Sequence, residues 1–271
     1  MDYQRRRMPL STWLGLSDLD LSIPVTSNFV PSYVLIFTRT ISLIYTLTVA
    51  ITNFVINIDN VWEGFFVYFT DLSFLGLVAY FMVSTYHSLR YYNGSIQFLH
   101  SSWIARSKFL RFVYWLLYET IVVFHVVVPI VYWTLIFTPS NRSTLLLWVN
   151  GSIHGSDFFF MIIEVVLGRW TLTWKHLPFV LLFPVLYMCM AFLNYAINDY
   201  FVYGFLNWYA RKSGYVALIY LGVALFFVAV FVAMLYVHRL RDRIGVKRRP
   251  ELAEREGLSS NPLQMIQVNS A

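Results

Sequence analysis

Long apolar runs separated by short polar segments are the main pattern of this chain. Six runs approach the roughly 20 residues that a helix needs to cross a bilayer. We predict transmembrane helices at Tyr33–Asn57, Gly64–Tyr86, Leu110–Phe137, Thr144–Leu167, Leu177–Ala196 and Tyr215–Val237. The third and the fifth contain Pro129 and Pro184, at which a membrane helix can bend. The pattern therefore predicts an all-α, polytopic membrane protein with a six-helix transmembrane bundle.

The distribution of Lys and Arg predicts how the bundle is oriented. These residues gather in the N-terminal arm, in the loops after helices two and four, and at the C-terminal end. Cytoplasmic segments are enriched in Lys and Arg, so we predict that both termini are cytoplasmic. Residues 1–30 and 243–271 are polar and lack a helical pattern. We predict a flexible N-terminal arm and a flexible cytoplasmic tail on either side of a transmembrane domain at 31–242.

Composition and charge narrow the class of protein. The chain is 58% hydrophobic and 13% charged, against about 25% charged residues in soluble domains. The net charge of +6 indicates contact of the cytoplasmic basic segments with anionic lipid rather than binding of nucleic acid. No obligate protein partner is evident. The expected location is integral to the endoplasmic reticulum or the plasma membrane.

Motifs for cofactors and metals are missing from the sequence. Cys189 is the single cysteine, which excludes an intrachain disulfide and a cysteine-based metal site. The six histidines are spread over different segments without metal-ligand spacing, and there is no phosphate loop. We predict no cofactor and no metal. Asn141 lies in a glycosylation sequon on the predicted outer side.

Helix four carries a ladder of polar residues. At roughly 100° per residue, four positions share a sector of about 80°: Asn150, His154, Asp157 and Glu164. Such groups are costly in a bilayer, so this face must contact protein or water, and it is a candidate site. A membrane transporter or channel whose pathway is lined by this ladder is one interpretation.

Thr70 in helix two lies at a depth comparable to that of His154. A hydroxyl beside a neutral imidazole is the minimum arrangement for nucleophilic catalysis. The alternatives are that Thr70 bonds the backbone one turn back, and that His154 makes an interhelical hydrogen bond in a non-catalytic membrane scaffold. Asp157 could hold the imidazole in one tautomer, or be an uncharged hydrogen-bonded acid. Asn150 and Ser73 are candidate oxyanion donors.

Arg39 and Glu164 lie at matching depths from the cytoplasmic side. Both are costly when unpaired, so we predict an ion pair between them. Three alternatives stay open: Arg39 extends to the lipid headgroups, Glu119 takes Glu164's place, or Arg39 binds the carboxylate of a ligand.

Several motifs together resemble a known family. YFTDLSFLGL, NGSIH followed ten residues later by the Glu of MIIE, WKHLPF and YFVYGFLNW occur in that order between about Phe66 and Trp208. They resemble the androgen-induced gene one-like family of six-span membrane proteins, in its fungal branch. Characterised animal members are threonine hydrolases that cleave fatty acid esters of hydroxy fatty acids with a Thr in helix two and a His in helix four.

The resemblance implies that Thr70 is the nucleophile and His154 the base. It departs from the family at Asp157, where relatives commonly carry a small or amide residue, and at Gly204, where proline is frequent. The expected function is therefore an intramembrane lipid ester hydrolase, a carboxylic ester hydrolase whose lipid substrate enters from the bilayer.

Overall fold

The computed structural model describes residues 9–17, 19–60, 65–138, 143–210 and 212–255 of the 271-residue chain. Within these ranges the chain forms helices joined by short connections, and no strand. Six helical spans are long and apolar enough to cross a membrane: Ser32–Ile56, Phe69–Gly94, Lys108–Ile136, Thr144–Leu167, Trp174–Asn198 and Ser213–Arg248. The predicted all-α six-helix bundle is confirmed, and the chain is a multi-pass membrane protein.

The spans are built from longer and shorter helical elements. The long ones are α2 (Ser32–Ile56), α4 (Phe69–Ser101), α6 (Lys108–Val131), α9 (Leu177–Asn198) and α10 (Ser213–Arg255). The fourth span consists of α7 (Thr144–Gly151), the π-helical η4 (Ser152–Ser156) and α8 (Asp157–Leu167). A second π-helical segment, η3 (Tyr132–Ile136), extends α6. The short elements are α1 (Leu10–Trp13), η1 (Ile23–Val25), η2 (Ile58–Asn60), α5 (Trp103–Arg106), η5 (Trp174–His176) and η6 (Gly204–Leu206).

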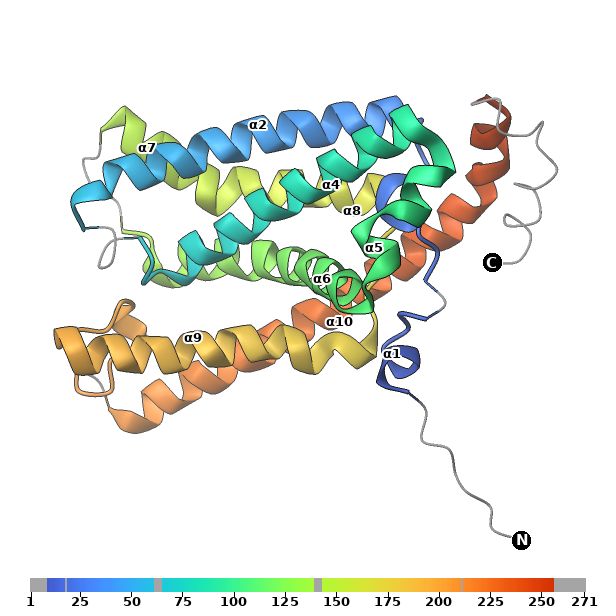
Figure 1. Cartoon of the computed structure of the whole chain (residues 1–271). Coiled ribbons are helices and arrows are strands. Elements are labelled where there is room, and N and C mark those ends of the chain that lie inside the picture. Colours follow the sequence, from blue (N-terminus) through green and yellow to red (C-terminus); the bar gives the residue numbers. More distant parts are fainter. Residues whose placement is uncertain (1–8, 18, 61–64, 139–142, 211, 256–271) are drawn as a thin grey trace, which may run out of the picture.

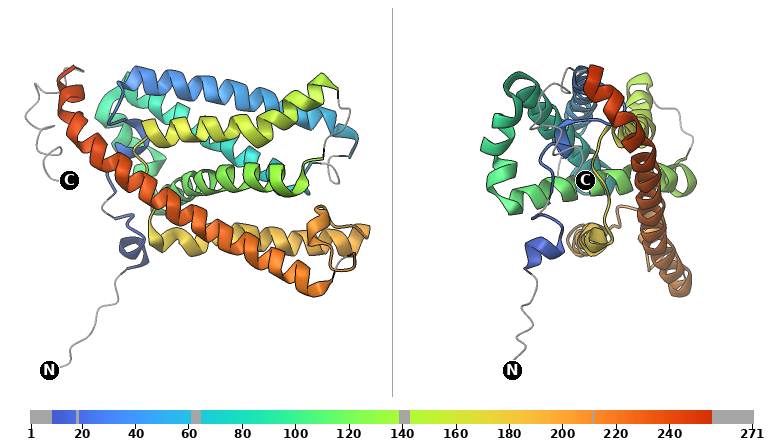
Figure 2. Two further views of the ribbon diagram at one scale, coloured as in Figure 1. Left: turned by 180° about the vertical axis from the view of Figure 1, so that it is seen from behind. Right: turned by 90° about the vertical axis from the view of Figure 1, so that its right-hand side faces the viewer.

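Helix α6 lies at the centre of the bundle and contacts α4, α8, α9 and α10. Figure 1 shows α2, α4, α7 and α8 on one side of α6, and α9 with the first half of α10 on the other. Figure 2 shows α10 starting beside α9 and then crossing the bundle obliquely. The largest buried side chains of α6 are aromatic, which suits a helix that is covered on most of its circumference.

The two π-helical segments occur where the sequence weakens regular α-helix. Pro129, near the end of α6, has no backbone N–H to donate to the preceding turn, and η3 follows three residues later. In the fourth span, Gly151 directly precedes η4 and Gly155 lies within it, and glycine has a low helix propensity. The predicted effect of Pro129 thus takes the form of a local change of helical pitch.

Helices α4 and α10 both extend beyond their predicted ends. The apolar part of α4 ends near Gly94, but the helix continues to Ser101. In the same way α10 continues to Arg255, so residues 243–255, for which we predicted no helical pattern, are helical. Most residues of this stretch are good helix formers, although it also contains Gly245 and Pro250. Residues 256–271 lie outside the described part of the chain.

The prediction of a flexible N-terminal arm is also wrong for the described residues between 9 and 30. Leu14, Leu16 and Val25 are buried, so this segment contributes to the core. Three buried side chains of the bundle also bond to its backbone carbonyls. Arg111 donates to Leu16 at 2.6 Å, Arg39 to Pro24 at 2.7 Å, and Nε2 of His176 lies 3.1 Å from the carbonyl oxygen of Leu14. These contacts are long-range, so the short polar sequence of the arm gave no sign of them.

The packed part of the arm and the charged end of α10 lie at the same end of the bundle (Figure 1). Gly245 of α10 packs so closely on Asn28 that a Cβ atom there would lie 2.9 Å from Cβ of Asn28. The opposite end carries the start of α4 and the loop between α9 and α10. The bundle therefore has a basic end that holds both terminal segments, as the predicted topology requires.

We expect deletion of residues 1–26 to lower the thermal unfolding temperature of the protein in detergent. The deletion leaves Arg39, Arg111 and His176 without their backbone acceptors, and each unsatisfied buried donor costs about 1–3 kcal/mol. Deletion of residues 1–8 is the matched control, because it leaves all three carbonyl groups in place. Equal unfolding temperatures for the two truncated proteins would contradict a structural role for the arm.

Candidate functional site

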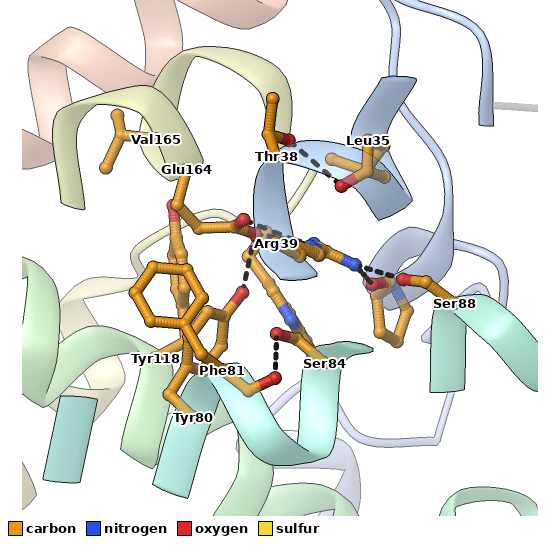
Figure 3. A network of polar contacts seen from close by, with 12 residues as sticks. Leu35, Thr38, Arg39, Tyr80, Phe81, Ser84, Ser88, Tyr118, Glu164 and Val165 are labelled. Carbon is orange, nitrogen blue, oxygen red and sulfur yellow. Dashed lines mark hydrogen bonds and ion pairs between the residues drawn. The ribbon is translucent and has the colours of Figure 1, made fainter. Parts of the chain in front are cut away.

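Glu164 forms the predicted ion pair with Arg39. Nε of Arg39 donates to Oε2 at 3.0 Å and Nη2 donates to Oε1, and both side chains are buried. Nη1 donates to the carbonyl oxygen of Pro24 at 2.7 Å and to Oγ of Ser88 at 2.6 Å, and the hydroxyl of Tyr80 donates to Glu164 at 2.7 Å (Figure 3). All three guanidinium nitrogens have protein acceptors. This arrangement argues against a ligand-binding role and against extension of Arg39 to the headgroups.

Glu119, the competing partner for Arg39, is bonded elsewhere. Its carboxylate accepts from the backbone N–H of Thr173 at 3.1 Å and contacts Nδ1 of His176 at 2.9 Å. Both side chains of the Glu119–His176 pair are fully buried. This pair joins α6 to the start of α9, as the Arg39–Glu164 pair joins α2 to α8.

Asp157 is bonded to His125 rather than to His154. Oδ2 of Asp157 lies 2.6 Å from Nδ1 of His125, and Nε2 of His125 lies 3.2 Å from the carbonyl oxygen of Ser73. The hypothesis that Asp157 orients His154 is therefore wrong for this structure. The physical reason is that Asp157 begins α8 on the side that faces α6, where His125 lies.

The contacts of His125 fix the proton content of this pair. Nε2 needs a proton to donate to a carbonyl oxygen, and the short Nδ1–Oδ2 contact contains a second proton. The pair thus holds two protons, as imidazolium with carboxylate or as imidazole with carboxylic acid, and it is neutral overall. With both nitrogens engaged, His125 joins α4, α6 and α8 and has no free lone pair to act as a base.

His154 lies in η4, where the helix departs from α geometry. Its backbone angles, φ −118° and ψ 16°, are not helical. The imidazole stacks on the ring of Tyr132 with a centroid separation of 3.4 Å and an interplanar angle of 2°. The indole N–H of Trp133 donates to the carbonyl oxygen of His154 at 2.7 Å. The unusual backbone and the stacking together aim the ring at η3.

The two candidate oxyanion donors are engaged in bonds of their own. Asn150 donates to the carbonyl oxygen of Leu146 at 2.8 Å and accepts from the hydroxyl of Tyr132 at 3.1 Å. Ser73 donates its hydroxyl to the carbonyl oxygen of Thr70 at 2.9 Å. Both groups therefore support the site in this structure, Asn150 by positioning Tyr132 and Ser73 within α4.

Thr70 lies in the wall of a cavity of about 100 Å³ between α4, α6, α9, α10 and the loop after α9. Its side chain is 8% exposed, and its hydroxyl oxygen lies 3.3 Å from that of Tyr203. The rest of the lining is almost entirely apolar: Phe69, Val127, Val128, Val131, Ile136, Pro184, Tyr187, Met188, Phe205, Leu206, Val223 and Phe227. The cavity is suited to an alkyl chain, with two hydroxyl groups at one point of its surface.

Thr70 and His154 occupy neighbouring elements, because η4 contacts α4. Their side chains face different partners, Thr70 towards Tyr203 and His154 towards Tyr132. Among the described residues that line the cavity, η3 contributes Ile136 and α6 contributes Val131, which directly precedes Tyr132. The predicted nucleophile is therefore in the cavity, and the predicted base is packed against the segment that closes one side of it.

Three residues that build the site were not identified from the sequence as part of it: His125, Tyr132 and Tyr203. His125 had a usable signal, since a histidine within an apolar span is costly and implies a partner. The two tyrosines had none, because the chain contains 19 tyrosines and 24 phenylalanines. Local sequence does not distinguish an aromatic ring that faces the site from one that faces lipid.

No group of three or more His, Cys, Asp or Glu side chains in the described part of the chain is arranged to hold a metal ion. Asn141 lies outside the described residues. Comparison with family models, curated proteins and solved structures finds no match to this chain. The interpretation of the site therefore depends on its own geometry and on the motifs quoted above.

We expect Glu164→Gln to destabilise the bundle strongly, because it leaves the buried guanidinium of Arg39 uncompensated. Breaking one partner of a buried pair costs about 3–5 kcal/mol. Unfolding in detergent, followed by helical circular dichroism, measures the loss.

The double variant Arg39→Met with Glu164→Met is the matched control. It removes both charges while keeping the volume similar, and it should recover much of the stability that Glu164→Gln loses. A double variant that is no more stable than Glu164→Gln would contradict this expectation.

Proposed function

We propose that the protein is an intramembrane lipid ester hydrolase in which Thr70 is the nucleophile and His154 the general base. The observation that carries the proposal is the hydroxyl of Thr70, itself a buried residue, in the wall of an apolar cavity. A threonine whose hydroxyl only bonds the backbone of its own helix requires no cavity beside it. A nucleophile that attacks a lipid ester needs both the cavity and the exclusion of bulk water.

The apolar lining favours a substrate with alkyl chains on both sides of its ester bond. Helices α9 and α10, which form one wall, are buried over only 17% and 22% of their most apolar windows, so most of their surface faces the bilayer. A lipid can therefore approach the cavity laterally, between these helices. By the resemblance described above, the substrate class is a fatty acid ester of a hydroxy fatty acid.

In the proposed reaction, Oγ1 of Thr70 attacks the ester carbonyl carbon while His154 accepts the threonine proton. The carbonyl electron pair becomes an oxyanion, then re-forms the C=O bond as the C–O bond to the alcohol breaks. The alcohol leaves with the proton from His154. Water then hydrolyses the acyl-threonine in the same two steps, releasing the fatty acid.

This mechanism requires the imidazole of His154 to turn from Tyr132 towards Thr70. Two features support such a movement: the non-helical backbone at His154 and the π-helical pitch of η4. Single π-helical turns are frequent at functional sites. Catalytic contacts are also often longer in the absence of substrate.

The contacts of the polar ladder argue against a transporter or channel. Asp157 is bonded to His125 and Glu164 to Arg39, both buried between helices. Groups that line an aqueous pathway are solvated, whereas these side chains form buried pairs with side chains of neighbouring helices. The non-catalytic scaffold is the remaining alternative, and the Thr70 experiment below separates it from a hydrolase.

We further propose that the basic end of the bundle is cytoplasmic and binds anionic lipid. Arg239, Arg243 and Lys247 are exposed and follow one another at four-residue intervals on α10, so they share a face. Basic residues next to a membrane are attracted to anionic headgroups. The endoplasmic reticulum and the plasma membrane are the two compartments proposed.

We expect Thr70→Ala to abolish hydrolysis of 4-nitrophenyl octanoate and of a hydroxy fatty acid ester by the purified protein in detergent micelles. Removal of a nucleophile lowers kcat by about 10⁴-fold or more. His154→Ala should lower kcat by about 10²–10⁴-fold, the usual contribution of a general base. Both variants should also lose covalent labelling by a fluorophosphonate probe.

Two exposed residues provide matched controls for these substitutions. Thr48→Ala removes a threonine hydroxyl from the outer surface of α2, and His100→Ala removes an exposed imidazole from the end of α4. Both should retain wild-type activity. A Thr70→Ala protein with full activity and full labelling would refute the hydrolase mechanism and leave the scaffold.

A further inference from the structure

The loop between α9 and α10 folds back over the cavity and is held at both ends. Asp199 adopts a left-handed conformation with φ 60°, which ends α9 and turns the chain. The side-chain amide of Asn194 in α9 donates to the carbonyl oxygen of Tyr200 at 2.9 Å. The hydroxyl of Tyr220 in α10 donates to the carbonyl oxygen of Leu206 at 3.3 Å. The loop is therefore a fixed wall of the cavity.

Tyr203 is the residue of this loop that reaches Thr70. Its ring stacks on Phe205 with a centroid separation of 5.4 Å and an interplanar angle of 9°. Tyr68 contacts it edge-on at 5.9 Å, and Tyr187 lies at 6.1 Å. Three aromatic neighbours thus fix the plane of the ring, and this directs its hydroxyl to Oγ1 of Thr70 at 3.3 Å.

The chemical state of Tyr203 decides what its hydroxyl can do. Burial raises the pKa of Tyr203 to about 12. The group is therefore a neutral phenol across the physiological range and does not accept the proton of Thr70 as a phenolate would. Its available role at the reaction centre is to donate a hydrogen bond.

We propose that Tyr203 is the oxyanion donor of this site, so that the loop 199–208 supplies part of the reaction centre. The proposal rests on the hydrolase function proposed above. The oxyanion forms on the carbon that Oγ1 of Thr70 attacks, adjacent to that oxygen. The Tyr203 hydroxyl already lies beside Oγ1. A rotation about the bond between its ring carbon and its oxygen turns the hydroxyl hydrogen towards the oxyanion.

The charge that develops on the oxyanion explains why a fixed donor matters here. A pre-positioned donor in an apolar site stabilises developing charge more than it stabilises the neutral ester. The aromatic neighbours of Tyr203 hold it in place before substrate binds, so little reorganisation is needed. The two oxyanion donors suggested by the sequence are already engaged. The side-chain amide of Asn150 donates to Leu146, and the hydroxyl of Ser73 donates to the carbonyl oxygen of Thr70.

The test compares Tyr203→Phe, Tyr209→Phe and Thr70→Ala, with 4-nitrophenyl octanoate as the substrate and rates normalised to monodisperse protein. Phenylalanine keeps the ring and its stacking and removes one oxygen. We expect Tyr203→Phe to lower kcat by about 10²–10³-fold, as removal of one oxyanion donor does, with KM changed less than about threefold. Tyr209 is 76% exposed, and Tyr209→Phe should behave as wild type.

The split between kcat and KM separates a donor from a packing residue. A packing role would raise KM or lower the unfolding temperature while leaving kcat per folded molecule near the wild-type value, and that result overturns the proposal. Retention of wild-type kcat by Tyr203→Phe while Thr70→Ala is inactive also overturns it, but leaves the hydrolase function standing. Full activity of Thr70→Ala rejects both.

Discussion

The buried pair of Arg39 and Glu164 sets the constraint on which the rest of the bundle depends. An isolated charge within a bilayer costs several kcal/mol, so neither residue is tolerated without the other. The pairing of the two side chains holds α2 against α8. The hydroxyl of Tyr80 in α4 and the carbonyl group of Pro24 in the N-terminal arm form hydrogen bonds to the pair. One ion pair thus joins four segments: the N-terminal arm, α2, α4 and α8.

The same rule organises the other acidic groups of the core. Asp157 and Glu119 each contact a histidine, and each of these histidines also contacts a backbone carbonyl, of Ser73 and of Leu14 respectively. Such acid–histidine units hold two protons and carry no net charge, which suits a low-dielectric interior. The polar ladder of the fourth span is therefore used mainly to join helices. Of the four residues of the ladder, only His154 belongs to the proposed reaction, and the proposed nucleophile Thr70 lies outside the ladder, in α4 at the wall of the cavity.

The sequence predicted those features that hydropathy and depth determine. Spans follow from the length of the apolar runs, and the Arg39–Glu164 pair follows from two charged groups that are costly when unpaired and lie at equal depth.

The partner of Asp157 was not predictable by the same reasoning, since choosing His125 over His154 requires knowledge of the rotation of α8 against α6. The packing of Leu14 and Leu16 was missed because the leucines of the arm alternate with polar residues and form no long apolar run. Thr70 was identified by its depth and by family resemblance, whereas Tyr203 depends on a loop that folds back.

The site combines a rigid half and an adjustable half. Tyr203 is fixed by aromatic neighbours and by a loop bonded to two helices, so its hydroxyl is held at Thr70. His154 lies instead in a π-helical turn and packs on Tyr132, which is itself in a π-helical turn. Single π-helical turns interrupt the regular hydrogen-bond pattern of an α-helix and are frequent at functional sites. In the proposed mechanism, the base on the adjustable half approaches Thr70 when substrate fills the cavity, while the rigid half keeps the Tyr203 hydroxyl in place beside Thr70.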